Sequence, residues 1–358
     1  MKQRVHDWGT RLGDSMRAAL ADGDVESARR LALQGDDRAR DLAREYTFMA
    51  RGLGVTLDVL LHLLREAHAR GAADAAGAGD ARQASERDGD LAIVLRRLLQ
   101  GLRDSVGDGR PPADAANVPA RATVTELADA VGQALAASQV HFTTDQARRA
   151  DDVALALAEG RTQDATALLD AKDRAWLALH DPLVRFMADA FAWMLGHFGA
   201  QGLLRFHLDT AEGQRTGFEK WERMPPDEFA ATTAFLLRQH MGQVQVDEDE
   251  RRFTIRQSPC GSGGRLRLGG AYAGPNALPF VEESGPLTFG EPRMPVYCTH
   301  CAIWNGSATL RWFGRAQWVF ERPAQAEGSC TLHIYKRRED TPESYSRRVA
   351  LPGAEETR

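Results

Sequence analysis

Apolar residues recur at helical spacing through the first two-thirds of the chain, and two stretches of this region resemble each other. Residues 19–24 read Ala-Leu-Ala-Asp-Gly-Asp and residues 156–161 read Ala-Leu-Ala-Glu-Gly-Arg. Ala28 follows the first stretch at the spacing at which Ala165 follows the second. In each copy the pattern predicts a helix that ends at the glycine, then a short helix and a longer apolar one.

The longer apolar helices are expected over residues 42–70 and 182–197, and Pro182 suits the first turn of the second one. Two helical hairpins of similar design would pack as a bundle or as a pseudo-twofold pair. The alternative is chance similarity, because an alanine-rich composition makes spurious matches easy. We therefore predict a helical bundle and favour an internal duplication of hairpins.

The stretch between the two copies, residues 71–123, is rich in Ala, Gly and Asp and offers little to bury. Helical apolar spacing returns over residues 91–102. We therefore expect a flexible linker with one short helix. A further helix is predicted over residues 124–137, with Thr123 or Thr125 as its N-cap.

In the last third of the chain, alternation of the kind found in sheets replaces the helical spacing. Residues 244–246 and 253–256 alternate apolar with polar side chains, and the acidic run between them suits a hairpin turn. A helix is expected over residues 299–313, and two last strands over 318–320 and 331–335. This order predicts a small antiparallel sheet with a helix on one face.

The fold class expected from these patterns is α+β, with an N-terminal helical bundle followed by a small sheet-plus-helix domain. The predicted division of the chain is a first helical repeat (1–70), a flexible linker (71–123), a second helical repeat (124–243), a mixed α+β domain that carries the metal site argued below (244–338) and a charged tail (339–358).

The chain carries a net charge of −5 over 358 residues, and its acidic and basic residues are interspersed. This pattern indicates no general affinity for nucleic acid or for a membrane surface. The first residues lack an apolar signal segment, and no stretch approaches the roughly 18 apolar residues of a membrane span. We therefore expect a soluble cytoplasmic protein, and the abundant Ala and Arg suggest a GC-rich bacterial genome.

All four cysteines fall in the last hundred or so residues, which random scatter would rarely produce. Cys298 and Cys301 form a C-x-x-C motif, with Cys260 before it and Cys330 after it. A reducing cytoplasm disfavours disulfides, and Zn²⁺ is the ion that most often takes four thiolates, or three thiolates and an imidazole. The sequence therefore predicts a Zn²⁺ site with Cys330 or His300 as the fourth ligand.

The chemistry of such a site depends on its fourth position. Four thiolates would close the zinc site and make it structural, whereas three thiolates and an open position could activate water. Two alternatives need no metal: isolated cysteines packed in a core, or a nucleophilic Cys260 with His300 as its base. The glycine-rich residues 261–264 allow an anion-binding nest or a tight turn beside a metal ligand, and we favour the turn.

Polar residues of the helical region supply candidates for a ligand pocket, placed where the bundle would meet the mixed domain. These candidates are His180, His197, His207 and Arg205, and Arg205 would suit an acidic substrate. The alternative is structural. His180 would then lie where a helix begins, with Asp181 as its cap, and His197 and His207 would be half-buried polar residues.

Three short motifs carry a resemblance to a known group of domains. They are Cys-Thr-His-Cys at residues 298–301 before a helix, Cys-Thr-Leu-His-Ile at 330–334 opening the last strand, and the Pro-Cys-Gly-Ser-Gly-Gly-Arg-Leu of residues 259–266. The last 110 or so residues resemble the small zinc-binding α+β domains grouped around the 4-vinyl reductase domain and the L-2-amino-thiazoline-4-carboxylate hydrolase-like bacterial proteins. The first likeness implies small-molecule sensing and the second implies amide or ring hydrolysis. The cysteine spacing departs from the vinyl-reductase type, and no catalytic residue is transferred.

Two classes of function follow from these features. In the first, the protein is a zinc-dependent enzyme, a hydrolase or lyase, which acts on a small molecule between the bundle and the cysteine-rich domain. In the second, it is a binding or sensing module with a purely structural zinc. The non-repetitive residues 264–295 favour the enzyme, because a loop of this length often belongs to a site. The oligomeric state stays open, a homodimer included.

Overall fold

The computed structural model describes residues 5–33, 35–73, 78–105, 119–323, 325 and 327–351. The chain divides into two compact units, each assembled from separate segments. The first unit contains residues 1–9, 55–87 and 187–358, and the second contains residues 10–54 and 88–186. The sequence predicted consecutive segments with boundaries at residues 70, 123, 243 and 338. The two compact units are assembled from separate segments and do not test these boundaries, so the predicted division stays a prediction.

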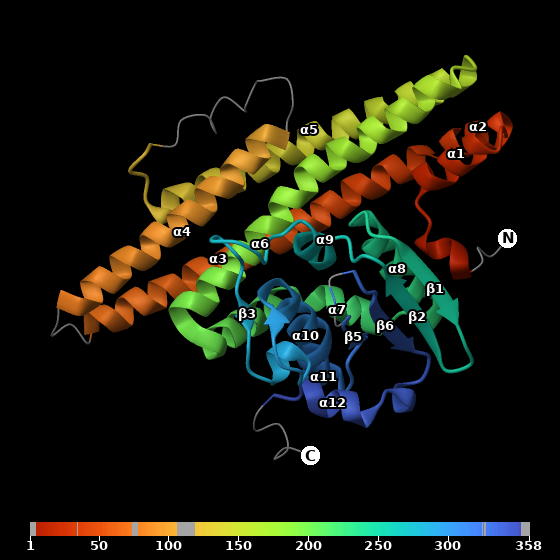
Figure 1. Cartoon of the computed structure of the whole chain (residues 1–358). Helices are drawn as coiled ribbons and strands as arrows, with labels where there is room; N and C mark the ends of the chain where they lie inside the picture. Colours follow the sequence, from red (N-terminus) through yellow and green to blue (C-terminus); the bar gives the residue numbers. More distant parts are fainter. Residues whose placement is uncertain are drawn as a thin grey trace. The chain divides into compact units, whose positions relative to one another are not determined.

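Helices make up most of the chain before residue 240, as predicted (Figure 1). A 3-10 turn, η1, covers Val5–Gly9. The α-helices that follow are α1 (Leu12–Ala21), α2 (Val25–Leu33), α3 (Gly35–Ala73), α4 (Ala78–Ser105), α5 (Val124–Ala158), α6 (Thr162–Gly213), α7 (Arg215–Glu222) and α8 (Pro226–Gln239). Among these helices of the described residues, none combines the length and the apolar character that crossing a membrane requires.

The C-terminal part of the first unit holds the predicted antiparallel sheet, so the α+β expectation is confirmed. Its strands are β1 (Val244–Glu248), β2 (Arg252–Gln257), β5 (Val319–Glu321) and β6 (Cys330–Tyr335), in the order β1-β2-β6-β5. The intervening chain forms a small pair, β3 (Phe280–Val281) with β4 (Met294–Pro295). It also forms α9 (Gly263–Leu268), α10 (Thr299–Ala302), the π-helical η4 (Ile303–Ser307) and α11 (Ala308–Phe313).

The sheet buries one face under α8. Phe253 on β2 pairs with Ile334 on β6, and Ile255 pairs with Leu332; all four side chains are buried. Burying each such side chain contributes about 1.5–3 kcal/mol relative to leaving it in water. Four buried residues of α8 pack into the same cluster, namely Phe229, Ala230, Ala234 and Leu237.

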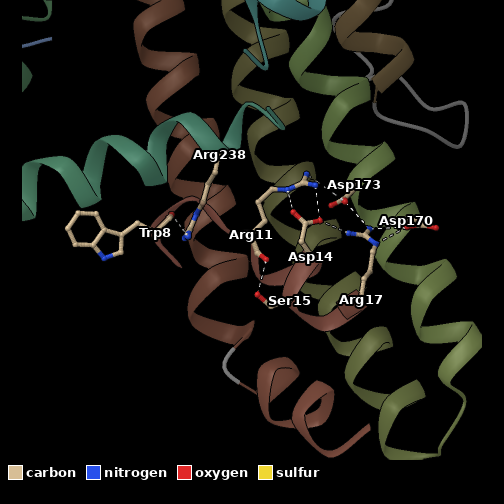
Figure 2. A network of polar contacts seen from close by, with 8 residues as sticks. All are labelled: Trp8, Arg11, Asp14, Ser15, Arg17, Asp170, Asp173 and Arg238. Atoms are coloured by element: carbon tan, nitrogen blue, oxygen red, sulfur yellow. Dashed lines mark hydrogen bonds and ion pairs between the residues drawn. The ribbon is translucent and has the colours of Figure 1, made fainter. Parts of the chain in front are cut away.

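The N-terminal turn η1 joins this core. The ring of Trp8 lies 5.6 Å from that of Phe253, and the Trp8 carbonyl accepts a hydrogen bond of 2.9 Å from Arg238 Nη1 on α8 (Figure 2). Gly9 follows, and a side chain there would collide with the carbonyl group of Val244. The turn η1 is thereby fixed against β1 and α8.

The segment expected as a charged tail contains another helix, α12 (Glu343–Val349). Tyr345 and Val349 are buried in the core cluster of the sheet, and Ser307 Oγ donates a 2.7 Å hydrogen bond to the Val349 carbonyl. The two apolar residues are four positions apart and so share one helix face. The many charges around them hid this spacing from the sequence analysis.

In the second unit, the two similar stretches adopt the same local structure. Gly23 and Gly160 both have left-handed backbones, with φ of 75° and 76°. The N–H after each glycine, of Asp24 or Arg161, donates a 2.8 Å hydrogen bond to the carbonyl of the alanine that opens its stretch. This is the αL termination that glycine favours. The duplication itself stays a hypothesis.

Both stretches also contribute to one buried cluster. Ala28 and Ala165, which hold equivalent positions, are each fully buried in it, and Leu157 is fully buried beside them. A polar contact accompanies the cluster, because Arg17 on α1 reaches α6 with hydrogen bonds of 3.0 Å to Asp170 and 2.8 Å to Asp173 (Figure 2). The helices around the two glycines therefore pack against each other.

Pro182 does not begin a helix, contrary to the sequence prediction. Helix α6 starts at Thr162 and runs through Pro182, so Asp181 is no N-terminal cap. The proline ring packs on α4 at Gly101, where an added Cβ would lie 2.5 Å from the proline Cβ. The backbone of α6 departs from helical geometry further along, at Gly199, whose φ is 66°.

The stretch predicted as a linker with one short helix contains the 28-residue helix α4. The spacing over 91–102 is confirmed as its buried face: Leu91, Leu95, Leu98 and Leu102 are buried. Residues 74–77 and 106–118, where flexibility was also expected, lie outside the described residues. The predicted cap of α5 is confirmed, because Thr123 and Glu126 form a reciprocal capping box.

Candidate functional site

The fold places the four cysteines at the ends of elements around one end of the sheet. Cys330 opens β6 directly opposite Gln257, and Cys260 follows Gln257 by three residues. Cys298 ends a 3-10 turn, η3 (Val296–Cys298), and Cys301 lies one turn further in α10. All four are free thiols of intermediate exposure.

The pKa shifts of three thiols have the other cysteines among their causes, which indicates that the four lie near one another. Burial, followed by the charge of Cys260, raises the pKa of Cys298 to about 12. Burial also raises the pKa of Cys330 well above its usual range, with Cys260 and Cys298 adding to the effect. The pKa of Cys301 is raised by burial and then by all three other cysteines. The fold therefore brings together the four residues that the sequence analysis grouped.

The thiols are engaged with their neighbours and do not form a ready coordination sphere. Cys301 Sγ lies 3.4 Å from His300 Nε2, and Cys260 Sγ lies 3.5 Å from Ser262 Oγ. Within the part of the chain that the structure describes, no group of three or more His, Cys, Asp or Glu side chains is arranged to hold a metal ion. Zinc binding therefore stays a prediction.

The glycine-rich segment packs closely against two of the cysteines. A Cβ at Gly263 would lie 3.1 Å from Cys298 Sγ, and one at Gly264 would lie 3.2 Å from Cys260 Cβ. These distances are tighter than ordinary van der Waals contacts, so a larger residue would push the thiols aside. Both glycines lie at the start of α9, and the expected turn covers the two residues before them, so close packing against the cysteines accounts for these two glycines.

Two guanidinium groups act on the cysteines, and no motif in the sequence singled them out. The charges of Arg267 on α9 and Arg322 after β5 lower the pKa of Cys298 and of Cys330, against the larger effect of burial. Arg267 donates to the Gln325 carbonyl (3.2 Å) and Arg322 donates to Glu291 (3.3 Å). Positive charge is therefore available where thiolates would form.

His300 is neutral, and its hydrogen bonds define its tautomer. Its Nδ1 lies 2.5 Å from the Tyr297 carbonyl, which can only accept, so Nδ1 carries the proton. Nε2 then holds a lone pair, and the thiol of Cys301 donates to it. Burial lowers the pKa of His300 to about 4, so the imidazole is uncharged at neutral pH.

His207 on α6 lies beside the same segment and is fully buried. Its Nε2 lies 2.8 Å from Thr299 Oγ1, whose hydroxyl donates a 2.7 Å hydrogen bond to the Val296 carbonyl. Because the hydroxyl proton of Thr299 is already donated to the Val296 carbonyl, Thr299 Oγ1 can only accept from His207. His207 therefore donates from Nε2 and keeps a lone pair on Nδ1. Burial, and then the charge of His300, lower the pKa of His207 well below its usual value.

Aromatic rings surround the two imidazoles. Phe191 lies edge-on to His207 at 4.6 Å between ring centroids and 5.8 Å from His300. Trp304 lies 6.1 Å from His207 and 4.9 Å from His300, and Tyr297 lies 4.7 Å from His300. We call these five residues the aromatic–imidazole cluster.

The other predicted pocket residues have separate surroundings. His180 belongs to the second unit, where it is buried with its Nδ1 2.9 Å from Asp181. His197 is half-buried against the ring of Trp193, at 5.3 Å. Arg205 is exposed and forms ion pairs with Glu66 (2.8 Å) and Asp209 (3.5 Å). Of the four residues, His207 is the one that the structure places beside the cysteine segment.

No family model matches the chain, and neither the curated proteins nor the solved structures contain a match to it. The resemblance to the vinyl-reductase and thiazoline-hydrolase domains therefore stays an expectation. Function has to be inferred from the cysteines and from the aromatic–imidazole cluster.

Proposed function

We propose that the protein binds one Zn²⁺ through Cys260, Cys298, Cys301 and Cys330. The observation that carries the proposal is the convergence of the four thiols, which come from three segments of the chain and lie within electrostatic reach of one another. The raised pKa values of Cys298, Cys301 and Cys330 keep these three thiols protonated without a metal. Zinc would displace those protons, because a coordinating thiol is deprotonated.

The charges around the cysteines support this assignment. Four thiolates and one Zn²⁺ carry a formal charge of about −2. Arg267 and Arg322 oppose the rise in the pKa values of Cys298 and Cys330, so they would stabilise the thiolate state. Gly263 and Gly264 leave room for the thiols to turn toward a common ion.

A zinc ion held by four thiolates has no open position and is structural. It would join the exit of β2, the turn before α10 and the start of β6, and so stabilise the sheet unit. In this function the zinc supports a binding or sensing module and takes no part in catalysis.

A catalytic zinc is the second candidate, and His300 is the observation that favours it. The tautomer of His300 leaves a lone pair on Nε2, the form in which a histidine binds metal while its other nitrogen is held by a carbonyl. Three thiolates with a water in the open fourth position would suit a hydrolase or lyase acting on a small molecule, and the Nε2 lone pair of His300 could then accept a proton from that water.

Metal analysis of the full chain tests the proposal. We expect about one zinc per chain after reducing purification, with all four thiols shielded from a thiol reagent until a chelator is added. Cys298→Ser should lose the metal, whereas Ser329→Ala, next to Cys330, should keep it. A metal-free protein with four reactive thiols would contradict the proposal. One zinc with a single reactive thiol would favour the catalytic candidate.

A further inference from the structure

Two buried polar atoms of the aromatic–imidazole cluster have no hydrogen-bond partner. They are Nδ1 of His207 and Nε1 of Trp304. The two rings are nearly perpendicular, with centroids 6.1 Å apart. Leaving a buried donor or acceptor unpaired is unfavourable, because the group has given up its hydrogen bonds to water. An unpaired acceptor and an unpaired donor on neighbouring rings therefore indicate a missing partner that can satisfy both.

The hydrogen-bonding roles of the two atoms are fixed. His207 donates from Nε2 to Thr299, so its Nδ1 can only accept. The indole nitrogen of Trp304 can only donate. A partner for both must present an N–H or O–H to His207 and an acceptor atom to Trp304.

The surroundings favour an uncharged, planar partner. His207 is fully buried among aromatic rings, and this burial lowers its pKa, so its imidazole is neutral. The remaining rings, of Phe191 and Tyr297, are buried with their centroids 6.2 Å apart, so the two polar atoms lie among aromatic groups. Apolar walls with a few converging polar atoms are typical of small-molecule sites.

Trp304 is partly open to solvent and lies in an irregular helical segment. It is half-buried, whereas His207 and Phe191 are fully buried, so a small molecule would enter on the side of the indole. Trp304 lies in the π-helical segment η4, between α10 and α11. Single π-helical turns within α-helices are frequent at functional sites.

We propose that His207 and Trp304 form a binding site for a small, neutral, planar cyclic amide. Its N–H donates to His207 Nδ1, its carbonyl accepts from Trp304 Nε1–H, and its ring stacks among the aromatic residues. The site goes beyond the zinc function and does not require the metal, because neither atom takes part in the cysteine group.

Titration of the full-length protein with 2-pyridone tests the site, with N-methyl-2-pyridone as the matched ligand that lacks the donor. Saturation-transfer NMR and calorimetry should show saturable binding of 2-pyridone and binding at least about tenfold weaker for the methylated form. His207→Phe and Trp304→Phe should each weaken the binding of 2-pyridone by about tenfold or more. Trp318→Phe is the control, since its buried Nε1 also lacks a partner but lies in the sheet core.

The indole ¹⁵N–H resonance of Trp304, assigned by its absence in Trp304→Phe, gives a readout that needs no His207 variant. It should shift on titration while that of Trp318 stays in place. Equal affinity for the two pyridones, no saturable binding, or equal loss in Trp318→Phe would overturn the proposal. Zinc content is measured on the same samples, with and without chelator, so failure of the zinc site and failure of this site are separate results.

Discussion

Gly101 on α4 and Pro182 on α6 form a close helix–helix contact, in which an added Cβ at Gly101 would lie 2.5 Å from the proline Cβ. We expect Gly101→Ala to lower the free energy of unfolding by about 1–3 kcal/mol, because the methyl group overpacks the contact. Alanine is otherwise about 1 kcal/mol more favourable than glycine inside a helix.

Gly132 on α5 is the matched control, since nothing lies within 4 Å of the position its Cβ would take. Gly132→Ala should raise the free energy of unfolding by up to about 1 kcal/mol. Urea denaturation of the two variants measures both effects. Equal stabilisation by the two substitutions would show that the proline contact does not exist.

Gly23 and Gly160 should respond alike to substitution, because both have φ near 75° and open space around the missing Cβ. Changing either to alanine should lower the free energy of unfolding by about 1–2 kcal/mol, because a residue with a Cβ is strained in the left-handed conformation. Asn tolerates this conformation better, so Gly23→Asn and Gly160→Asn should cost less. A cost confined to one of the two glycines would count against their structural equivalence.

Protonation of His333 should destabilise the sheet in acid. His333 Nδ1 lies 3.0 Å from Thr254 Oγ1, and Nε2 lies 3.0 Å from Glu321. Burial lowers its pKa, Arg252 and Arg256 add to this, and Glu321 opposes them. With the folded pKa below the unfolded value of about 6.5, the unfolded state takes up the proton first, and stability falls as pH drops below about 6.5.

Denaturation midpoints between pH 7.5 and 5 measure this dependence. His333→Gln should flatten the curve, although it should also lower stability at pH 7.5 by removing a buried hydrogen-bonded ring. His62→Gln replaces an exposed imidazole near Glu66 and is the control. An unchanged pH dependence in His333→Gln would rule out this imidazole as its source.

Arg322 should influence zinc affinity if the proposed metal site is correct. Arg322→Gln removes a positive charge that favours the thiolates of Cys298 and Cys330. We expect the zinc dissociation constant to rise by about tenfold, as is usual for groups that act on ligands from outside the coordination sphere. Arg322→Lys should recover part of the loss. Arg293→Gln, at an exposed pair with Glu282, should have no effect in the same chelator competition.

The sequence was sufficient for features that depend on local spacing. Period-2 alternation located β1 and β2, and the buried leucines of α4 follow the helical spacing seen over residues 91–102. A helix over residues 299–313 was also expected, although the π-helical form of residues 303–307 was not. These elements are determined by residues within one or two turns of one another.

Features that depend on distant partners could not be predicted in this way. Pro182 lies inside a helix and packs its ring on Gly101, which is far away in the sequence. The α12 residues Tyr345 and Val349 show their role only once the sheet is present. His207 is about 100 residues from Trp304, and no local pattern in either segment records their proximity.

The buried cluster that contains Ala28 and Ala165 has a consequence for how the protein assembles. Equivalent surfaces of two similar helix–turn–helix stretches meet there, as the two halves of a symmetric homodimer do. In a homodimer such a contact weakens on dilution. Here the chain itself joins the two surfaces, so their association is intramolecular and independent of protein concentration. The second unit can therefore keep this dimer-like contact even in a single copy of the chain.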